Sequence, residues 1–288
     1  MKSSKVISQT PSSLFYFSCF LSCAVLLLIL AGGLVTSHEA GLAVPDWPLS
    51  YGRLMPKMVG NVFWEHGHRM IAGTVGMLTL VLAVWIQRLE KRVWLKKLGW
   101  IAFAAVVCQA ILGGLTVKMM LPPPVSIFHA CLAQTFFCLI IAVTYFLSPR
   151  FLSEVRYSQV FTKPTLFFIT TGFIYLQLIL GAVIRHTHHY IPLHVANAFF
   201  VLIHIFLATG RINRLYGQDP LMKRAGTALG FVTLVQVFLG MGAFIFKYML
   251  ERSYAPSAGE VFFTAAHQTT GALILGLSVL ISLIAGLR

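Results

Sequence analysis

Residues 126–147 read SIFHACLAQTFFCLIIAVTYFL, an apolar run with no charged side chain and a single histidine, His129, near its start. A helix needs about 20 such residues to cross a bilayer, where it satisfies its own backbone hydrogen bonds. Seven further runs have similar length and composition: 14–36, 67–87, 97–117, 164–184, 192–210, 226–247 and 262–285. We therefore expect eight transmembrane helices.

The composition of the whole chain agrees with this expectation. The 288 residues are 58% hydrophobic and 10% charged, with a mean hydropathy of +0.82, whereas soluble domains carry about 25% charged residues. Lys2 and Lys5 precede the first run as in a signal peptide, but the run is longer than a signal-peptide core and lacks an Ala-x-Ala-like cleavage site. The sequence predicts an all-α polytopic membrane protein with a retained first helix.

The basic residues predict the orientation. Most of the 22 lysines and arginines lie in the N-terminal segment, at the last residue and in the connections after the second, fourth and sixth runs. The positive-inside rule places those segments, and so both termini, in the cytoplasm. The net charge of +14 is explained by this rule and by anionic lipid, so a nucleic-acid partner is not needed.

Four histidines lie near the starts of alternate apolar runs: His68, His129, His194 and His267. Histidine is costly in hydrocarbon and is a common metal ligand. The predicted topology brings all four to one depth near the outer surface, where they resemble two pairs of axial ligands for haem iron. Small residues beside them would leave room for a macrocycle, or would only let helices pack closely.

A repeated motif divides the chain into similar halves. The motif reads Gln109-Ala-Ile-Leu-Gly113, Gln177-Leu-Ile-Leu-Gly181 and Gln236-Val-Phe-Leu-Gly240, each ahead of one of these histidines. We expect two pseudo-symmetric four-helix bundles, residues 1–150 and residues 160–288, joined by a basic linker at 148–163.

The two halves differ beside their first histidines. Glu65 lies three residues before His68 in the motif Glu65-His66-Gly67-His68-Arg69, and its counterpart before His194 is Ile191. A carboxylate beside only one metal centre suggests chemistry at the first site and electron transfer at the second. Alternatively, Glu65 caps its helix and favours the positive helix N-terminus; both roles can hold together.

The other histidines and the cysteines carry weaker signals. His186, His188 and His189 read as a solvated outer loop, with a metal site as the alternative, and His38 and His66 read as pocket lining. His204 lies in the middle of a run and is expected to donate a hydrogen bond to a neighbouring helix. All five cysteines lie in apolar runs, so we expect core residues without a disulfide. They are Cys19, Cys23, Cys108, Cys131 and Cys138.

The Glu65–Arg69 motif, combined with Gly41-Leu42-x-x-Pro45-Asp46-Trp47-Pro48 and the repeat, resembles the haem A synthase family over the whole chain. The resemblance implies an oxidoreductase that oxidises a methyl group of haem O to a formyl group, giving haem A for cytochrome oxidase. We expect the segment 37–65 to be a rigid loop able to cover a pocket.

The resemblance also implies the site residues. His194 and His267 would bind a haem b cofactor in the C-terminal bundle. His68 and His129 would bind haem O in the N-terminal bundle, with Glu65 as the acid that the reaction needs. Trp47 and Arg69 would contact the substrate, and Arg69 would pair with a haem propionate or with Glu65.

In one respect the chain departs from the family. Many members carry a cysteine pair in the first outer loop, one of them just before Pro-Asp-Trp-Pro, where this chain has Val44. Neither this loop nor residues 185–191 contain a cysteine. The chain is therefore placed in the subgroup without the pair, and a cysteine-based role in electron intake or haem transfer is excluded.

The resemblance implies a bacterial inner-membrane protein with haem sites near the outer face. Contacts with haem O synthase, with an electron donor or acceptor and with a second copy of the chain all remain open. The main rival is a two-haem b-type cytochrome that only transfers electrons, which gives no reason for Glu65 to occur in one half alone. A second rival, a transporter with internal repeats, predicts polar or broken spans near the midplane.

Overall fold

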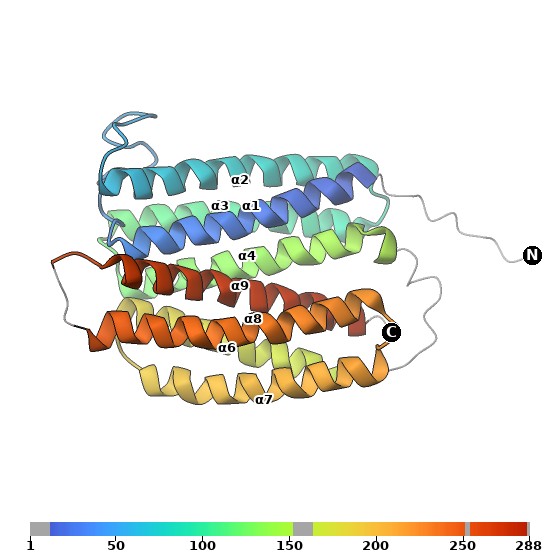
Figure 1. Ribbon diagram of the computed structural model, residues 1–288. Helices are drawn as coiled ribbons and strands as arrows, with labels where there is room; N and C mark the ends of the chain where they lie inside the picture. Colours follow the sequence, from blue (N-terminus) through green and yellow to red (C-terminus); the bar gives the residue numbers. More distant parts are fainter. Residues whose placement is uncertain (1–11, 152–163, 251–253, 287–288) are drawn as a thin grey trace, which may run out of the picture.

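The computed structural model describes residues 12–151, 164–250 and 254–286. This part of the chain contains eight helices that are long and apolar enough to cross a membrane (Figure 1). They are α1 (Ser12–Ser37), α2 (Asn61–Leu89), α3 (Val93–Lys118), α4 (Pro123–Leu147), α6 (Thr165–Thr187), α7 (Ile191–Leu215), α8 (Pro220–Phe244, continued by the π-helix η1, Ile245–Met249) and α9 (Ala258–Gly286). The predicted all-α membrane protein is confirmed.

The helices run up and down in alternation, so that α2, α4, α7 and α9 all begin at the same end of the molecule (Figure 1). α1 packs on α2 and α4, and α3 packs on α2 and α4, which closes a first ring of four helices. α6, α7, α8 and α9 close a second ring in the same way. A pseudo-symmetric relation between the rings stays a prediction.

The two rings share an interface centred on α9. α9 packs on α1 and α4 of the first ring, and α4 also packs on α6. An apolar cluster lies inside each ring, built around Leu82 and Ile140 in the first and around Ile205 and Leu275 in the second. In contrast, α2 packs mainly on α1 and α3, and α7 mainly on α6 and α8, so these two helices lie at the periphery.

Prolines and an aspartate fix several helix starts. Pro123 and Pro192 occupy the first turns of α4 and α7, where a missing N–H costs nothing. Asp219 caps α8 by accepting the backbone N–H groups of Leu221 and Met222. These starts set how far His129 and His194 lie from the helix ends.

The largest departures from the predicted helix starts are at α2, which begins at Asn61 rather than near residue 67, and at α8, which begins at Pro220 rather than near residue 226. Gly60 is the N-cap of α2, with no side-chain cap bond, and Glu65 lies beyond the first turn. The expectation that Glu65 caps the helix is therefore wrong. Its carboxylate is neutralised by Arg69 one turn later on the same helix face, an i,i+4 pair.

Some sequence predictions fall on residues outside the described ranges. Lys2, Lys5 and the last residue, on which the cytoplasmic placement of both termini partly rests, are among them. The predicted linker 148–163 is described only up to residue 151.

Candidate functional site

The four predicted ligand histidines lie within the first ten residues of α2, α4, α7 and α9. Because these helices begin at one end of the molecule, the histidines are gathered at that end (Figure 1). The first ring holds His68 and His129, and the second holds His194 and His267.

The imidazoles of His194 and His267 face each other with their ring centroids 6.3 Å apart. A metal ion held between two imidazoles by nitrogen–metal bonds of about 2.0–2.1 Å separates the centroids by about 6 Å. Nδ1 of His267 lies 3.1 Å from the backbone oxygen of Gln236, a hydrogen bond that makes Nε2 the acceptor atom of the ring. Nε2 lies 3.5 Å from the side-chain nitrogen of Gln236, a long contact that a metal ligand bond would replace. The spacing and this tautomer fit a metal shared by two axial histidines.

His68 and His129 lie on α2 and α4 of the first ring. The Nδ1 atoms of His68, His129 and His194 are buried without a hydrogen-bond partner. A buried imidazole nitrogen without a partner is costly in a protein interior, and a metal bond at that nitrogen would offset the cost. The donor sets of both pairs therefore fit the axial ligands of a haem.

Each histidine ring packs against a glycine of the preceding helix. A Cβ added at Gly32, Gly113, Gly181 or Gly240 would lie 3.1, 3.1, 3.3 or 2.8 Å from Cε1 of His68, His129, His194 or His267, respectively. The glycines thus let each imidazole lie directly against a backbone. The sequence repeat showed three of these glycines without indicating this contact.

The glutamine of the repeat also has a structural role. Nε2 of Gln109 donates to the backbone oxygen of His129 at 2.8 Å, and Gln177 and Gln236 donate to those of His194 and His267 at 3.0 Å. These glutamines each lie four residues before the packing glycine. At the matching position in α1 the residue is Leu28, which has no side-chain donor.

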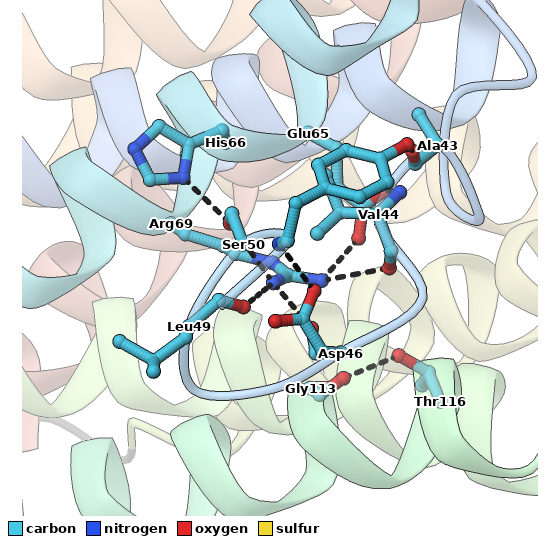
Figure 2. Close-up of polar contacts among 11 residues, drawn as sticks. Ala43, Val44, Asp46, Leu49, Ser50, Glu65, His66, Arg69, Gly113 and Thr116 are labelled. Carbon is cyan, nitrogen blue, oxygen red and sulfur yellow. Dashed lines mark hydrogen bonds and ion pairs between the residues drawn. The ribbon is translucent and has the colours of Figure 1, made fainter. Parts of the chain in front are cut away.

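The outer loop between α1 and α2 is fastened to α2 by Arg69 (Figure 2). The guanidinium donates to the backbone oxygens of Asp46 at 2.7 Å, Leu49 at 3.0 Å and Val44 at 3.3 Å. It also pairs with Oε1 of Glu65 at 2.5 Å. Of the two partners expected for Arg69, the structure shows Glu65.

Glu65 is held from both sides. Its Oε2 accepts the backbone N–H of Val44 at 2.8 Å, while Oε1 accepts from Arg69, and the residue is only 3% exposed. Val44 is completely buried. The residue in the family's cysteine position therefore contributes its backbone to the orientation of the carboxylate.

The loop has its own internal bonds (Figure 2). Asp46 accepts the backbone N–H groups of Gly52 at 2.8 Å and Tyr51 at 2.7 Å, and these bonds, that of Gly52 first, lower the pKa of Asp46. Ser50 Oγ lies 2.8 Å from Nδ1 of His66. These bonds support the prediction of a rigid loop; whether it covers a pocket stays a prediction.

Trp47 anchors the loop on α3. A Cβ added at Gly114 would lie 2.7 Å from its indole ring, so the ring packs directly on the backbone there. The residue remains 38% exposed. The loop thus bridges α2 and α3, near His129's partner glycine, Gly113.

The remaining histidines are distributed as follows. His204 shares a hydrogen bond with the backbone oxygen of Phe200 in its own helix at 2.8 Å, so the expected bond to a neighbouring helix is wrong. Its ring instead packs on Phe173 of α6, at 4.5 Å between centroids. His38 stacks on Trp64 at 4.1 Å. Among the described residues no group of three or more His, Cys, Asp or Glu could hold a metal ion, His186, His188 and His189 included.

Sequence reasoning gave no role to Arg185, which lies in the last turn of α6. Its guanidinium donates to the backbone oxygen of Gly33 at 2.8 Å and to Oγ of Ser37 at 2.8 Å, both in α1. A third bond reaches the backbone oxygen of Thr264 in α9 at 3.4 Å. Arg185 therefore ties the two rings together close to both histidine pairs; a charge at the end of an apolar run was its only sequence signal.

Fold and site together define an integral membrane protein with two histidine pairs suited to haem. Glu65 lies one helical turn before His68, and Ile191 occupies the matching position before His194. Residues 57–197 match the COX15-CtaA family of cytochrome oxidase assembly proteins. The match covers 141 of the 288 residues, just under half of the chain. The matched region contains Glu65, Arg69 and three of the four histidines, but not His267 or Trp47.

Curated relatives agree with the family match. The chain is 28% identical to the haem A synthase of Exiguobacterium sibiricum over 59% of its length and 58% of the relative's length. It is 29% identical to that of Symbiobacterium thermophilum, over 56% of each chain. A shorter match to that of Lysinibacillus sphaericus is 35% identical over 34% of this chain and 33% of the relative. The chain thus matches at most about half the length of these relatives.

Proposed function

We propose that the protein is a haem A synthase, an oxidoreductase that converts a methyl group of haem O to a formyl group and so makes haem A for cytochrome oxidase. The observation that carries the proposal is the asymmetry between the histidine pairs. Glu65 is buried one helical turn before His68, while Ile191 takes its place before His194. A purely electron-transferring protein has no use for this difference.

The C-terminal pair is the proposed site of a resident haem b. The separation of His194 and His267 and the hydrogen bond at Nδ1 of His267 support axial ligation there. His68 and His129 are the proposed ligands of haem O, and later of haem A, in the N-terminal ring. The two halves, residues 1–150 and 160–288, would then be a substrate domain and a cofactor domain.

In the proposed reaction, the bound haems would supply the redox centre, and the protein would position the substrate and accept a proton from it. Conversion of a methyl to a formyl group replaces two hydrogen atoms by one oxygen atom and is a four-electron oxidation. If the oxygen comes from water, four electrons and four protons pass to a redox partner and to solvent; if it comes from dioxygen, dioxygen takes the electrons and its second atom leaves as water. The Glu65 carboxylate would accept a proton released from the carbon or stabilise positive charge developing there. Arg69 and the Val44 N–H hold this carboxylate in place. Trp47 and the loop around it would contact the substrate and limit the access of water.

The charge distribution supports a bacterial inner-membrane location with both termini in the cytoplasm. The four histidines would then lie near the outer face. Haem O synthase, an electron donor or acceptor and a second copy of the chain remain candidate partners.

The haem complement of the purified protein tests the proposal. Co-expression with a source of haem O should yield protein that contains haem b together with haem O or haem A. Without the haem O source, haem b should remain and haem A should be missing. Haem b alone under both conditions would contradict the proposal and leave a two-haem electron carrier.

A further inference from the structure

The four helix pairs that carry the histidines have the same glycine–histidine packing, but they differ in the hydrogen bonds that hold the two helices together. Each pair places a glycine of the first helix against the histidine ring of the second. In the pairs α6–α7 and α8–α9, the clamping glutamine is itself held. Asn197 Nδ2 donates to Oε1 of Gln177 at 2.7 Å, and the Thr270 hydroxyl donates to Oε1 of Gln236.

The pairs of the first ring lack one or both of these bonds. In α3–α4, Gln109 clamps His129, but Oε1 of Gln109 is buried without a partner. In α1–α2 the clamping position holds Leu28, so the glutamine bond to His68 cannot form. Two hydrogen bonds of this kind, one made by the glutamine and one that holds it, are thus present at His194 and at His267. One is present at His129, and neither can form at His68.

Two sequence positions encode this gradient. Four residues before the packing glycine stand Leu28, Gln109, Gln177 and Gln236. Three residues after each histidine stand Ile71, Leu132, Asn197 and Thr270. Both positions are apolar in the His68 pair, and both are polar in the two pairs of the second ring.

Helix position in the molecule does not explain the difference. α2 and α7 are both peripheral, each packed mainly on its two ring neighbours. α7 is nevertheless clamped to α6 by the Gln177 bond, while Leu28 of α1 cannot form the corresponding bond to α2 at His68. Arg69 and Glu65 fasten α2 to the outer loop rather than to the α1 helix.

We propose that His68 is the ligand that detaches when haem enters or leaves the N-terminal site, and that Leu28 is the positioning residue that leaves it free to do so. The inference rests on the proposed function in taking the N-terminal haem as an exchanging substrate. An intramolecular hydrogen bond shifts an opening equilibrium by roughly 2–10-fold. Separation of α2 from α1 at His68 is thus less opposed than the corresponding motion at the other three histidines.

The test measures release of haem from each site separately. In the full-length protein, His194→Ala with His267→Ala leaves only the N-terminal site, and His68→Ala with His129→Ala leaves only the C-terminal site. Each protein is loaded with haemin or haem O, and release to excess apomyoglobin is followed by absorbance. We expect release from the N-terminal site to be at least 10-fold faster. Equal rates, or faster release from the C-terminal site, would overturn the inference.

The role of position 28 is tested by adding the missing clamp. Leu28→Gln in the N-terminal-site protein should slow release by roughly 2–10-fold, whereas Leu28→Met, of similar volume and without a donor, should not. Gln177→Leu in the C-terminal-site protein should speed release by a similar factor. Bis-histidine low-spin electron paramagnetic resonance signals should remain in all three variants. No slowing by Leu28→Gln, or equal slowing by Leu28→Met, would contradict the proposal.

These release rates do not depend on catalysis, so the two proposals can fail separately. Haem A formation with equal release rates would refute the exchange role of His68 and retain the synthase. Unequal release without haem A formation would refute the synthase and retain the loosely held ligand.

Discussion

The two rings of this protein share an arrangement of four helices with two histidines, but they differ in their connecting loops and in the positions of their polar side chains. In the first ring, a loop of more than twenty residues between α1 and α2 is fastened over the start of α2 by Arg69, beside the buried Glu65. In the second ring, only residues 188–190 join α6 to α7, and Ile191 stands in place of Glu65. In the second ring, the polar side chains of Gln177 and Gln236 instead bond the backbone oxygens of His194 and His267.

The comparison shows that two rings of four helices place their polar side chains differently around their histidines. Polar groups of the first ring surround the space beside a histidine, where they can act on a bound molecule. In the second ring, Asn197 donates to Gln177 and Thr270 donates to Gln236, so these polar groups hold the glutamines that bond the histidine helices. The proposed substrate site and the proposed cofactor site thus differ in where their hydrogen bonds end.

The most direct test of this difference between the rings is the substitution Glu65→Gln. Gln has the same shape and can still accept the Val44 N–H, so haem should stay bound, but it cannot accept a proton. We expect haem A formation to fall by about 10²–10⁴-fold, measured per bound haem by pigment extraction and chromatography. Haem A formation at the normal rate would remove the chemical distinction between the rings.

The matched control for this variant is Glu260→Gln in the second ring. Glu260 is also buried at the histidine end of the molecule, and it pairs with Lys247 at 2.7 Å. Because it belongs to the ring without proposed chemistry, haem A formation per bound haem should stay within about twofold of the wild type, a factor below ~0.5 kcal/mol. An equal loss in both variants would mean that any buried carboxylate at this end is required.

A second variant, Gly240→Ala, acts on the second ring alone. The added methyl group would lie 2.8 Å from Cε1 of His267 and would displace the ring from the Gln236 backbone oxygen. Loss of such an outer bond typically lowers metal affinity by about 10–100-fold, so the haem b content of purified protein should fall while the N-terminal site still binds haem. Gly172→Ala, where a Cβ meets nothing within 4 Å, should keep its haem. Similar haem loss in both variants would point to general helix damage.

The sequence predicted the eight helices because apolar length is almost sufficient to define a membrane span. It also identified the four histidines, since they stand out in hydrocarbon, and the repeat that contains Gln109 and Gly113. The roles of that glutamine and glycine could not be predicted, because both depend on the rotation of one helix against the next. The error at Glu65 has a similar origin: Asn61 and the three residues after it join the helix, which moves the N-terminus away from the carboxylate.

The loop is tested by Arg69→Lys, with a smaller expected effect. Lysine keeps the charge beside Glu65 but cannot form the fork that bonds the backbone oxygens of Asp46, Leu49 and Val44. Amide hydrogen exchange across residues 43–53 should become about 10-fold faster, given the 1.5–3 kcal/mol of a bond to a charged group. Arg53→Lys, an exposed change in the same loop, is the control. Unchanged exchange in Arg69→Lys would mean that the loop is held elsewhere, and that the first ring is less specialised than its contacts indicate.

The smallest effect concerns pH and is confined to the first ring. Bonds from the Gly52 and Tyr51 backbone N–H groups lower the folded-state pKa of Asp46 below its unfolded value of about 3.9. A depressed carboxyl pKa contributes stability that is fully present above the unfolded pKa and is lost as pH falls through the folded pKa. Exchange of the Tyr51 and Gly52 amides, corrected for intrinsic chemistry, should therefore be constant from pH 7 to about 5 and rise below pH 4. In Asp46→Asn, which has no carboxyl group to titrate, this rise should be missing; the same rise in both proteins would assign the acid sensitivity to another group.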